Sequence, residues 1–193
     1  IGGGIAGLFT AVKAAERERV LVITKKTLFE SNTRHAQGGI AAVISDDDSP
    51  EFHLEDTLAA GAGLCRPEAV RVLVTEGPAC IRELVNMGTH FDTENGTFAL
   101  TQEGAHSHRR ILHANGDATG AEIVRALSER ARVHPNIELW DNHFVVDLVS
   151  DGEECYGAIV LKPDGGLVFA AGKATVLASG GAGQLFRYTT NPD

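Results

Sequence analysis

Apolar residues at helical spacing follow a group of glycines at the start of the chain. In IGGGIAGLFTAVKAAE they recur three and four residues apart, as on one face of an α-helix: Ile5, Leu8, Phe9 and Val12. The run VLVIT at 20–24 is short, continuous and rich in β-branched residues, as a parallel strand buried on both faces should be. This order predicts the second half of a βαβ unit whose first strand is reduced to Ile1.

Three prolines predict the starts of three helices in the middle of the chain. Ser49 and Pro50 supply an N-cap and a first helical residue ahead of EFHLEDTLAAGAG. Pro67 begins PEAVRVLVTEG, and Pro78 begins PACIRELVNMG, which Gly88 ends. Residues 92–116 are charged and irregular. DATGAEIVRALSERARV then predicts an amphipathic helix capped by Asp117 or Thr119.

Closely spaced strand patterns occupy the last third of the chain. NIELW and HFVVDLVS predict two strands, CYGAIVLKP and LVFAAG predict a hairpin around DGG, and KATVLAS predicts a further buried strand. A meander where a crossover helix would be expected points to an FAD-type domain. We therefore predict an α/β fold, a Rossmann-like FAD-binding domain with a parallel sheet and a three-stranded antiparallel meander. The glycine-led start and the loop-like end, YTTNPD, suggest a piece truncated at both ends.

Composition narrows the classes of function. Hydrophobic residues make up 43% of the 193 positions and charged residues 22%, which is typical of a folded globular chain. The net charge of −9 argues against a nucleic-acid surface. Three widely spaced cysteines suit free thiols in a reducing compartment. With neither a signal peptide nor a long apolar run in the sequence, we expect a cytoplasmic location and no membrane partner.

The opening glycines match a dinucleotide-binding pattern. Gly2, Gly4 and Gly7 have the G-x-G-x-x-G spacing, which provides a tight turn, close backbone approach to a pyrophosphate and close helix–strand packing. A glycine-rich turn without a nucleotide is the alternative. The acidic residue that usually binds a ribose after the second strand is replaced by Thr24 and Lys25, which weakens the case for NAD.

The stretch SNTRHAQGGIAAV at 31–43 places polar side chains and two glycines just after the second strand. Together with TLAAGAG, QEGAHSHRRILHANGDATG and LASGGAGQLFRYTTNPD, it resembles the L-aspartate oxidases. These enzymes belong to the flavoprotein family that includes the succinate dehydrogenase and fumarate reductase flavoprotein subunits. The resemblance runs from Gly2 to Asp193 and implies that residues 1–193 are the N-terminal part of an FAD-binding domain. The capping domain and the C-terminal helical domain would lie outside this chain.

The resemblance assigns cofactor contacts residue by residue. The glycine turn would hold the FAD pyrophosphate, Lys25 would lie near the adenosine ribose, and 32–39 would line the isoalloxazine and ribityl side. Asn32 stands where relatives with covalent flavin have histidine, so we expect noncovalent FAD. The expected FAD-binding residues are Gly2, Gly3, Gly4, Ile5, Ala6, Gly7, Thr24, Lys25, Asn32, Thr33, Arg34, His35, Ala36, Gln37, Gly38, Gly39, Phe144, Val145, Gly180 and Gly181.

The segment EGAHSHRR is the candidate substrate patch. His106 and His108 alternate and would share one face of an extended chain, but no third ligand at metal-site spacing stands nearby, so we expect no metal. A solvated charged surface is one reading of Arg109 and Arg110, and a lining of the substrate side of the flavin is the other. The resemblance gives Glu103 the role of orienting aspartate, since a carboxylate can pair with the α-ammonium.

The implied reaction transfers a hydride from Cα of L-aspartate to the flavin, giving iminosuccinate, with dioxygen or fumarate as electron acceptor. Such a product would feed quinolinate synthase in NAD biosynthesis. The general base and the carboxylate-binding residues would then lie beyond Asp193. Two alternatives stay open: a flavoprotein subunit of the fumarate reductase or succinate dehydrogenase type, and a nucleotide-binding module without turnover.

Overall fold

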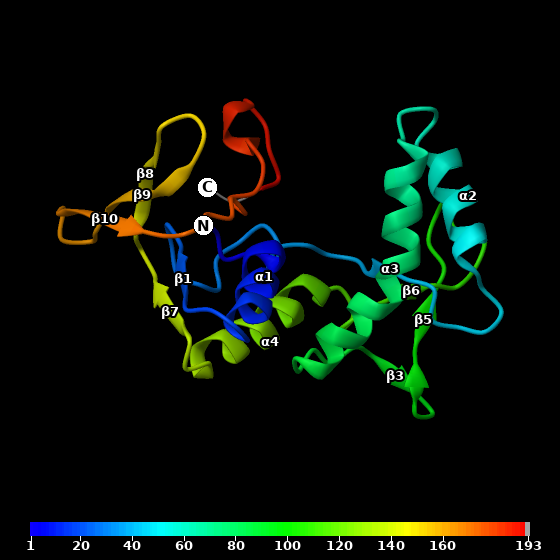
Figure 1. The fold of residues 1–193 in the computed structure, drawn as a ribbon. Helices are drawn as coiled ribbons and strands as arrows, with labels where there is room; N and C mark the ends of the chain where they lie inside the picture. Colours follow the sequence, from blue (N-terminus) through cyan, green and yellow to red (C-terminus); the bar gives the residue numbers. More distant parts are fainter. Residues whose placement is uncertain (192–193) are drawn as a thin grey trace. The chain divides into compact units, whose positions relative to one another are not determined.

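The structure, a computed structural model, describes residues 1–191 and consists of two compact units (Figure 1). The first unit combines Ile1–His35 with the chain from Ile123 onward, and the second unit is the continuous segment Ala36–Glu122. Helix α4 (Thr119–Val133) begins at the end of the second unit and continues into the first.

The first unit begins with the predicted glycine turn, helix and strand. Helix α1 buries one face, and strand β1 pairs in parallel with β7, so that Val20 lies opposite Ile137 and Ile23 opposite Trp140. Helix α4 buries apolar side chains that include Ile123, Val124 and Leu127. These elements are α1 (Ile5–Ala15), β1 (Val20–Ile23), α4 (Thr119–Val133) and β7 (Ile137–Trp140).

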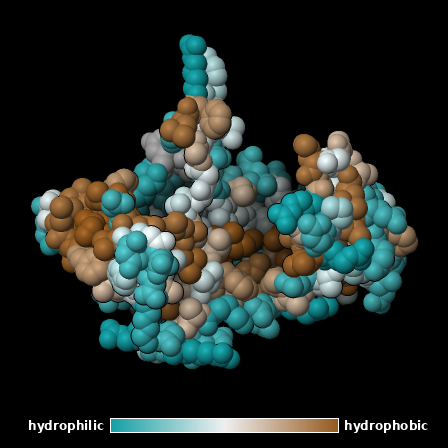
Figure 2. All heavy atoms as spheres, turned by 45° about the horizontal axis from the view of Figure 1, so that its top comes forward, coloured by the Kyte–Doolittle hydropathy of each residue, from teal (hydrophilic) through white to brown (hydrophobic). Residues whose placement is uncertain are grey.

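An antiparallel three-stranded sheet in the order β10-β9-β8 completes the first unit, as the strand patterns predicted (Figure 1). Its inner side chains, among them Ala158 and Val160, form a core cluster with Ile23 of β1. Its other face carries exposed apolar side chains such as Phe144 and Phe169. Figure 2 shows hydrophobic surface (brown) on the left of the view, the side on which these strands lie in Figure 1. The strands are β8 (Phe144–Ser150), β9 (Cys155–Leu161) and β10 (Leu167–Ala171).

The prediction of a buried strand for KATVLAS is wrong for this structure. Residues 173–179 form no strand, and Val176 and Leu177 are half exposed or more. The segment is extended beside Ile1: the Ile1 nitrogen donates to the Val176 carbonyl and the Ala178 amide donates to the Ile1 carbonyl, each at 2.8 Å. A single residue provides only these two bonds, so no ladder of successive pairs develops along the segment.

The second unit contains the proline-led helices α2 (Pro50–Ala60) and α3 (Pro67–Asn86). The Ser49 hydroxyl accepts a hydrogen bond from the Phe52 amide at 3.2 Å, which confirms the predicted cap of α2. Leu54 of α2 and Val70 and Val74 of α3 form a shared core cluster. The two helices therefore stabilise each other through these apolar contacts.

The prediction of two helices meeting at Pro78 is wrong, because α3 runs continuously through that residue. Proline in a helix interior lacks the amide that would bond four residues back. The helix nevertheless buries side chains on one face both before and after the proline, at Val70, Val74, Ile81 and Leu84. Burial of this stripe offsets the lost hydrogen bond. The helix ends at Met87 as its C-cap, and Gly88 follows with φ +103°, in agreement with the predicted stop.

Residues 92–116, expected to be irregular, contain short strands. Strand β3 pairs with β4, while β2, β6 and β5 form a three-stranded antiparallel sheet in that order. The sheet places Ile40 and Leu100 on either side of Leu112. These strands are β2 (Ile40–Ala41), β3 (Thr93–Glu94), β4 (Thr97–Phe98), β5 (Leu100–Thr101) and β6 (Ile111–Leu112).

None of the helices in the described part of the chain combines the length and the apolar character that a membrane span needs.

Candidate functional site

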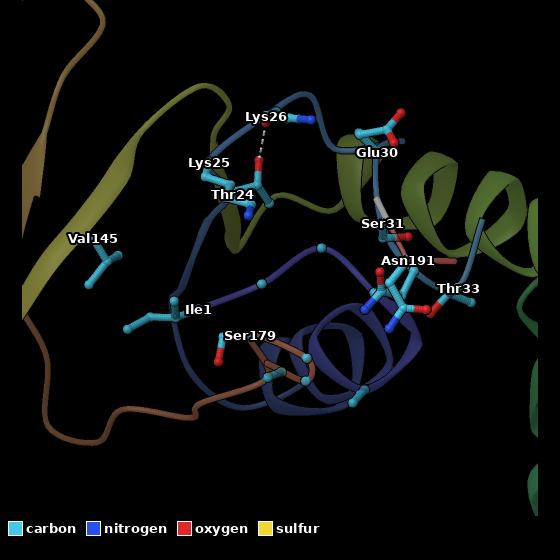
Figure 3. Close-up of a pocket in the computed structure, with 18 of the residues that line it drawn as sticks. Ile1, Thr24, Lys25, Lys26, Glu30, Ser31, Thr33, Val145, Ser179 and Asn191 are labelled. Atoms are coloured by element: carbon cyan, nitrogen blue, oxygen red, sulfur yellow. Dashed lines mark hydrogen bonds between the residues drawn. The ribbon is translucent and has the colours of Figure 1, made fainter. Parts of the chain in front are cut away.

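A cleft of roughly 590 Å³ lies in the first unit at the start of α1 (Figure 3). Pieces of the chain that are far apart in sequence line it together. They are the glycine turn at 1–6, the end of β1 at 23–26, the segment 30–33, the start of β8 at 143–145 and the loop around 178–185, with Asn191. The volume is within the usual range of about 300–1,000 Å³ for small-molecule and cofactor sites.

The N-terminus of α1 opens into this cleft without a side-chain cap of its own. Its N-cap residue is Gly4, and the first amides of a helix have no intrahelical acceptors. One of them, the Ile5 amide, donates to the Thr33 hydroxyl oxygen at 3.0 Å. The remaining amides and the helix dipole favour an anion at this end of the cleft.

At two positions of the motif, other backbone atoms come so close that only glycine fits. Gly2 has φ +112°, and a Cβ on it would come within 2.2 Å of the Ala178 carbonyl oxygen. A Cβ on Gly7 would come within 2.0 Å of the Gly2 carbonyl oxygen. Side chains at either position would push the turn away from the helix and from the 178–179 segment, so the cleft floor depends on both glycines.

At the end of β1, Thr24 holds the chain and Lys25 faces the cleft. The Thr24 hydroxyl donates to the Lys26 carbonyl oxygen at 2.6 Å, shown as the dashed line in Figure 3. Its oxygen also lies 3.3 Å from Oδ1 of Asp141, just after β7. With its proton directed at Lys26, the Thr24 hydroxyl is left to accept, so it would meet a ribose hydroxyl as an acceptor.

The structure brings most of the predicted first-unit residues to one place. Phe144 and Val145 line the cleft from β8, and Gly180 and Gly181 line it from the loop after 173–179. A Cβ on Gly180, which has φ +82°, would lie 3.3 Å from Nδ2 of Asn32, so the loop passes close to that amide. Arg34 and His35 are not among the lining residues of this cleft, and Gly7 lies behind the turn.

The sequence did not single out several lining residues, among them Glu30, Ser31, His143 and Ser179. Glu30 accepts from or pairs with His35 at 2.8 Å between Oε1 and Nε2. This hydrogen bond is the main reason why the pKa of Glu30 is lowered from its usual value. Proximity of Glu30 to the SNTRH segment was the only sequence signal for it.

In the second unit, the AQGG turn leads directly into the β2-β6-β5 sheet. Gly38 has φ +75°, and a Cβ on it would lie 4.0 Å from Oε1 of Glu103. A Cβ on Gly39 would collide with Ile111 Cγ2 at 2.2 Å and the Leu112 carbonyl oxygen at 2.6 Å. The paired glycines therefore let the turn lie flat against β6, and the Glu103 carboxylate lies beside that turn.

Arg110 is not a solvated charge, contrary to one of the two readings of EGAHSHRR. Its side chain is fully buried, with Nε and Nη2 donating to the Asp48 carboxylate at 2.8 and 2.7 Å and Nη1 donating to Asp56 at 2.6 Å. His106 Nδ1 lies 3.3 Å from the guanidinium and His108 Nδ1 lies 3.9 Å from Asp48, so both histidines lie beside this ion pair, although the segment forms a turn and not an extended chain. Arg109 is exposed. Arg110 therefore anchors this segment to α2.

The buried Arg110 also helps to shift the pKa values of two neighbouring residues, Asp56 and His53. Burial would raise the pKa of Asp56, but hydrogen bonds from the Ser107 amide and hydroxyl and from Arg110 outweigh it and lower the pKa to about 2. Burial lowers the pKa of His53, and the positive charge of Arg110 lowers it further. His53 Nδ1 is also buried without a hydrogen-bond partner within the described structure. Both shifts favour a negatively charged Asp56 and a neutral His53.

Comparison with known proteins defines the class. A family model described as FAD binding domain matches residues 1–193, and the chain belongs to that family. The fold agrees: E. coli quinol fumarate reductase superimposes on 99% of this chain with a TM-score of 0.91 and 32% sequence identity, using 33% of its own length. Mycobacterium smegmatis Sdh1 gives a TM-score of 0.90 and 31% identity over 100% of this chain and 35% of its own.

Among named relatives, the similarity is to L-aspartate oxidases. The chain is 48% identical to that of Streptomyces coelicolor, over 100% of this chain and 34% of the relative. It is 50% identical to the chloroplastic L-aspartate oxidase 2-a of Nicotiana tabacum, over 100% of this chain and 31% of the relative. The chain thus spans about a third of the length of the curated relatives it matches.

The first-unit cleft fits the dinucleotide end of FAD. Its floor is a glycine turn that closes tightly because Gly2 and Gly7 have no Cβ to collide with the neighbouring backbone, and the start of α1 offers backbone donors suited to a pyrophosphate. Thr24 and Lys25 lie at the end of β1, where the ribose of a dinucleotide is held in folds of this kind.

Proposed function

We propose that the full-length protein containing this chain is an FAD-dependent L-aspartate oxidase, which converts L-aspartate to iminosuccinate with dioxygen or fumarate as electron acceptor. The chain would supply the cradle for FAD and one substrate-orienting carboxylate. By the same proposal, the product would enter the quinolinate branch of NAD biosynthesis, with quinolinate synthase as a partner.

The observation that carries the proposal is the position of Glu103. Its carboxylate lies beside Gly38 in the turn expected to line the flavin ring, and it is half exposed, with a side-chain exposure of 50%. An accessible carboxylate at this place suits a ligand with a positive charge. Aspartate carries an α-ammonium that succinate and fumarate lack, so a charge-assisted hydrogen bond to Glu103 would favour aspartate.

The other residues of the chain have binding and positioning roles in this proposal. The α1 amides would bind the pyrophosphate, and the backbone groups at 36–39 would hold the polar edge of the ring. FAD, when bound, supplies the acceptor for the hydride that leaves Cα of aspartate. Glu103 would orient that Cα by holding the ammonium.

A fumarate reductase or succinate dehydrogenase type of flavoprotein is the second candidate, favoured by the TM-score of 0.91 with quinol fumarate reductase. Two residues argue against this second candidate. Asn32 occupies the position where covalent flavin attachment needs histidine, and Glu103 has no cationic group to bind in succinate or fumarate. A nucleotide-binding module without turnover is the third candidate.

The test is to purify the full-length protein, record its visible spectrum and follow hydrogen peroxide and 2-oxo acid formation with L-aspartate and, separately, with succinate. We expect a flavin spectrum and turnover of aspartate but not of succinate. Oxidation of succinate alone would favour the second candidate. A colourless protein that does not gain a flavin spectrum with added FAD would favour the third.

A further inference from the structure

The side chain next to Glu103 is His113, which the sequence patterns did not single out. His113 follows β6, and its Nε2 lies 2.8 Å from the Thr101 hydroxyl oxygen and 3.4 Å from Oε1 of Glu103. The His113 side chain is 16% exposed, against 50% for Glu103. The histidine is therefore held in place, while the carboxylate beside it reaches solvent.

The register of the β2-β6-β5 sheet explains why these residues meet. Thr101 pairs with Ile111, two positions before His113, so both side chains project from the same face of the sheet. Continuing the β2–β6 register by one residue places Gly39 opposite His113. A Cβ on Gly39 would lie 3.1 Å from Cε1 of His113, so the imidazole packs directly against the glycine turn.

We propose that His113 is a positioning residue for Glu103, and this inference rests on the proposed binding of an α-ammonium by that carboxylate. The Glu103 carboxylate favours a proton on Nε2 of His113, where the N–H donates to the Thr101 oxygen at 2.8 Å and places its positive end 3.4 Å from Oε1. This contact fixes one carboxylate oxygen beside the turn. The other oxygen, Oε2, remains for the ammonium of the substrate.

The arrangement assigns a specificity role that a purely structural histidine would not have. Loss of the N–H would let the Glu103 side chain take other rotamers, and holding it in one rotamer would then cost conformational entropy on binding. The effect would be confined to ligands with an α-ammonium. Dicarboxylates that lack the ammonium do not use Glu103 and would bind as before.

The experiment compares two ligands that the amine oxidation cannot consume. Succinate has no ammonium, and L-2-methylaspartate has the ammonium but no hydrogen on Cα. Their dissociation constants are measured by the change in flavin absorbance in the full-length FAD-loaded protein. The variants are His113→Phe, which keeps the ring shape without a donor, His113→Gln, which restores a neutral donor, Glu103→Gln, and Glu103→Gln with His113→Phe. Glu94→Gln, an exposed glutamate in β3, is the control.

We expect His113→Phe to reduce the preference for methylaspartate over succinate by about fivefold, the size of a partly exposed charged contact. His113→Gln should recover most of that preference, and the double variant should show no loss beyond that of Glu103→Gln. Equal weakening of both ligands in His113→Phe, or no change in either, would overturn the positioning role while leaving the proposed substrate intact. A wild-type protein that binds neither ligand would overturn the proposed substrate and this inference with it.

Discussion

Asn32 determines how a flavin would be attached in the full-length protein. An amide cannot form the histidyl–flavin bond, and the neighbouring His35 is engaged with Glu30 at 2.8 Å. We expect acid precipitation to release all the flavin into the supernatant, where its absorbance is measured. Denatured protein that stays yellow after washing would contradict the noncovalent assignment. The Asn32→His variant, treated identically, tests whether the linking position alone is sufficient.

Glu103 decides between substrates if the proposed function is correct. Replacing Glu103 by Gln should lower kcat/KM for aspartate. The loss of transition-state stabilisation calculated from the ratio of the two kcat/KM values should be about 1.5–3 kcal/mol, the range for a hydrogen bond to a charged group. Fumarate reduction by the same variant should change much less, because fumarate has no ammonium. Steady-state kinetics with both substrates check this, with Glu94→Gln as the matched control. Parallel losses with both substrates would show that Glu103 serves the fold or the flavin.

At the residue scale, the glycine motif and its partners could be predicted, but the side-chain pairs could not. Spacing alone identified Gly2, Gly4 and Gly7, because a tight turn before a helix leaves few other residue types possible. His113 and Thr101 lie twelve positions apart, and nothing in their local sequence shows that two strands bring them together. The same holds for Arg110 and Asp48, which are 62 positions apart.

At the scale of elements, the buried ion pair fixes the start of α2 to β6. Asp48 precedes the Ser49 cap, and its carboxylate, like the Arg110 guanidinium, is fully buried. Asp48→Asn would leave part of the buried arginine charge uncompensated, so we expect a loss on the order of 3 kcal/mol in the free energy of unfolding. Denaturant unfolding of the full-length protein measures it. Glu68→Gln, which breaks the exposed pair with Arg66, should cost less than about 1 kcal/mol. Similar losses in both variants would contradict the role of burial.

The same cluster predicts acid sensitivity of the second unit. The lowered pKa of His53 means that its neutral form stabilises the fold above the ordinary value of 6.5, and this contribution declines as the pH falls below it. Asp56, whose pKa falls from 3.8 to about 2, contributes stability above pH 3.8 that is lost as the pH falls toward 2. Unfolding midpoints across pH 7 to 2 should therefore decline in two stages. His53→Phe should remove the upper stage, and an unchanged profile in that variant would contradict its assignment.

The type of an element could be predicted where its hydrophobic pattern extends over many residues. Predicted boundaries were wrong where tertiary contacts determine where an element ends. The meander, α1 and α4 follow directly from their patterns. Pro78 was a misleading signal, because burial on both sides of it keeps α3 continuous. KATVLAS has a strand composition but only Ile1 beside it to exchange hydrogen bonds with. The two-residue strands of 92–116 are too short to show any periodicity.

For the whole molecule, we expect residues 1–193 alone to bind FAD poorly and to show no aspartate oxidation. The chain spans about a third of its curated relatives, and Val176 and Leu177 expose apolar surface beside Ile1. Hydrogen peroxide release with FAD and aspartate, compared with that of the full-length protein at equal concentration, is the measurement. Turnover by the shorter chain at even a tenth of the full-length rate would place all the catalytic groups within it.

The division into two units also affects the order in which parts of the chain can fold during synthesis. The second unit is one continuous segment, so all its pairing partners are available once residue 122 has left the ribosome. The first unit must wait longer, because β1 at 20–23 has its parallel partner in β7 at 137–140. Its opening helix and strand are thus synthesised early and completed late, with apolar surface uncovered while the whole of the second unit is made. Nascent chains arrested so that residue 122 has left the ribosome while 137–140 are still inside it should show 36–122 protected from proteolysis and 1–35 not yet protected.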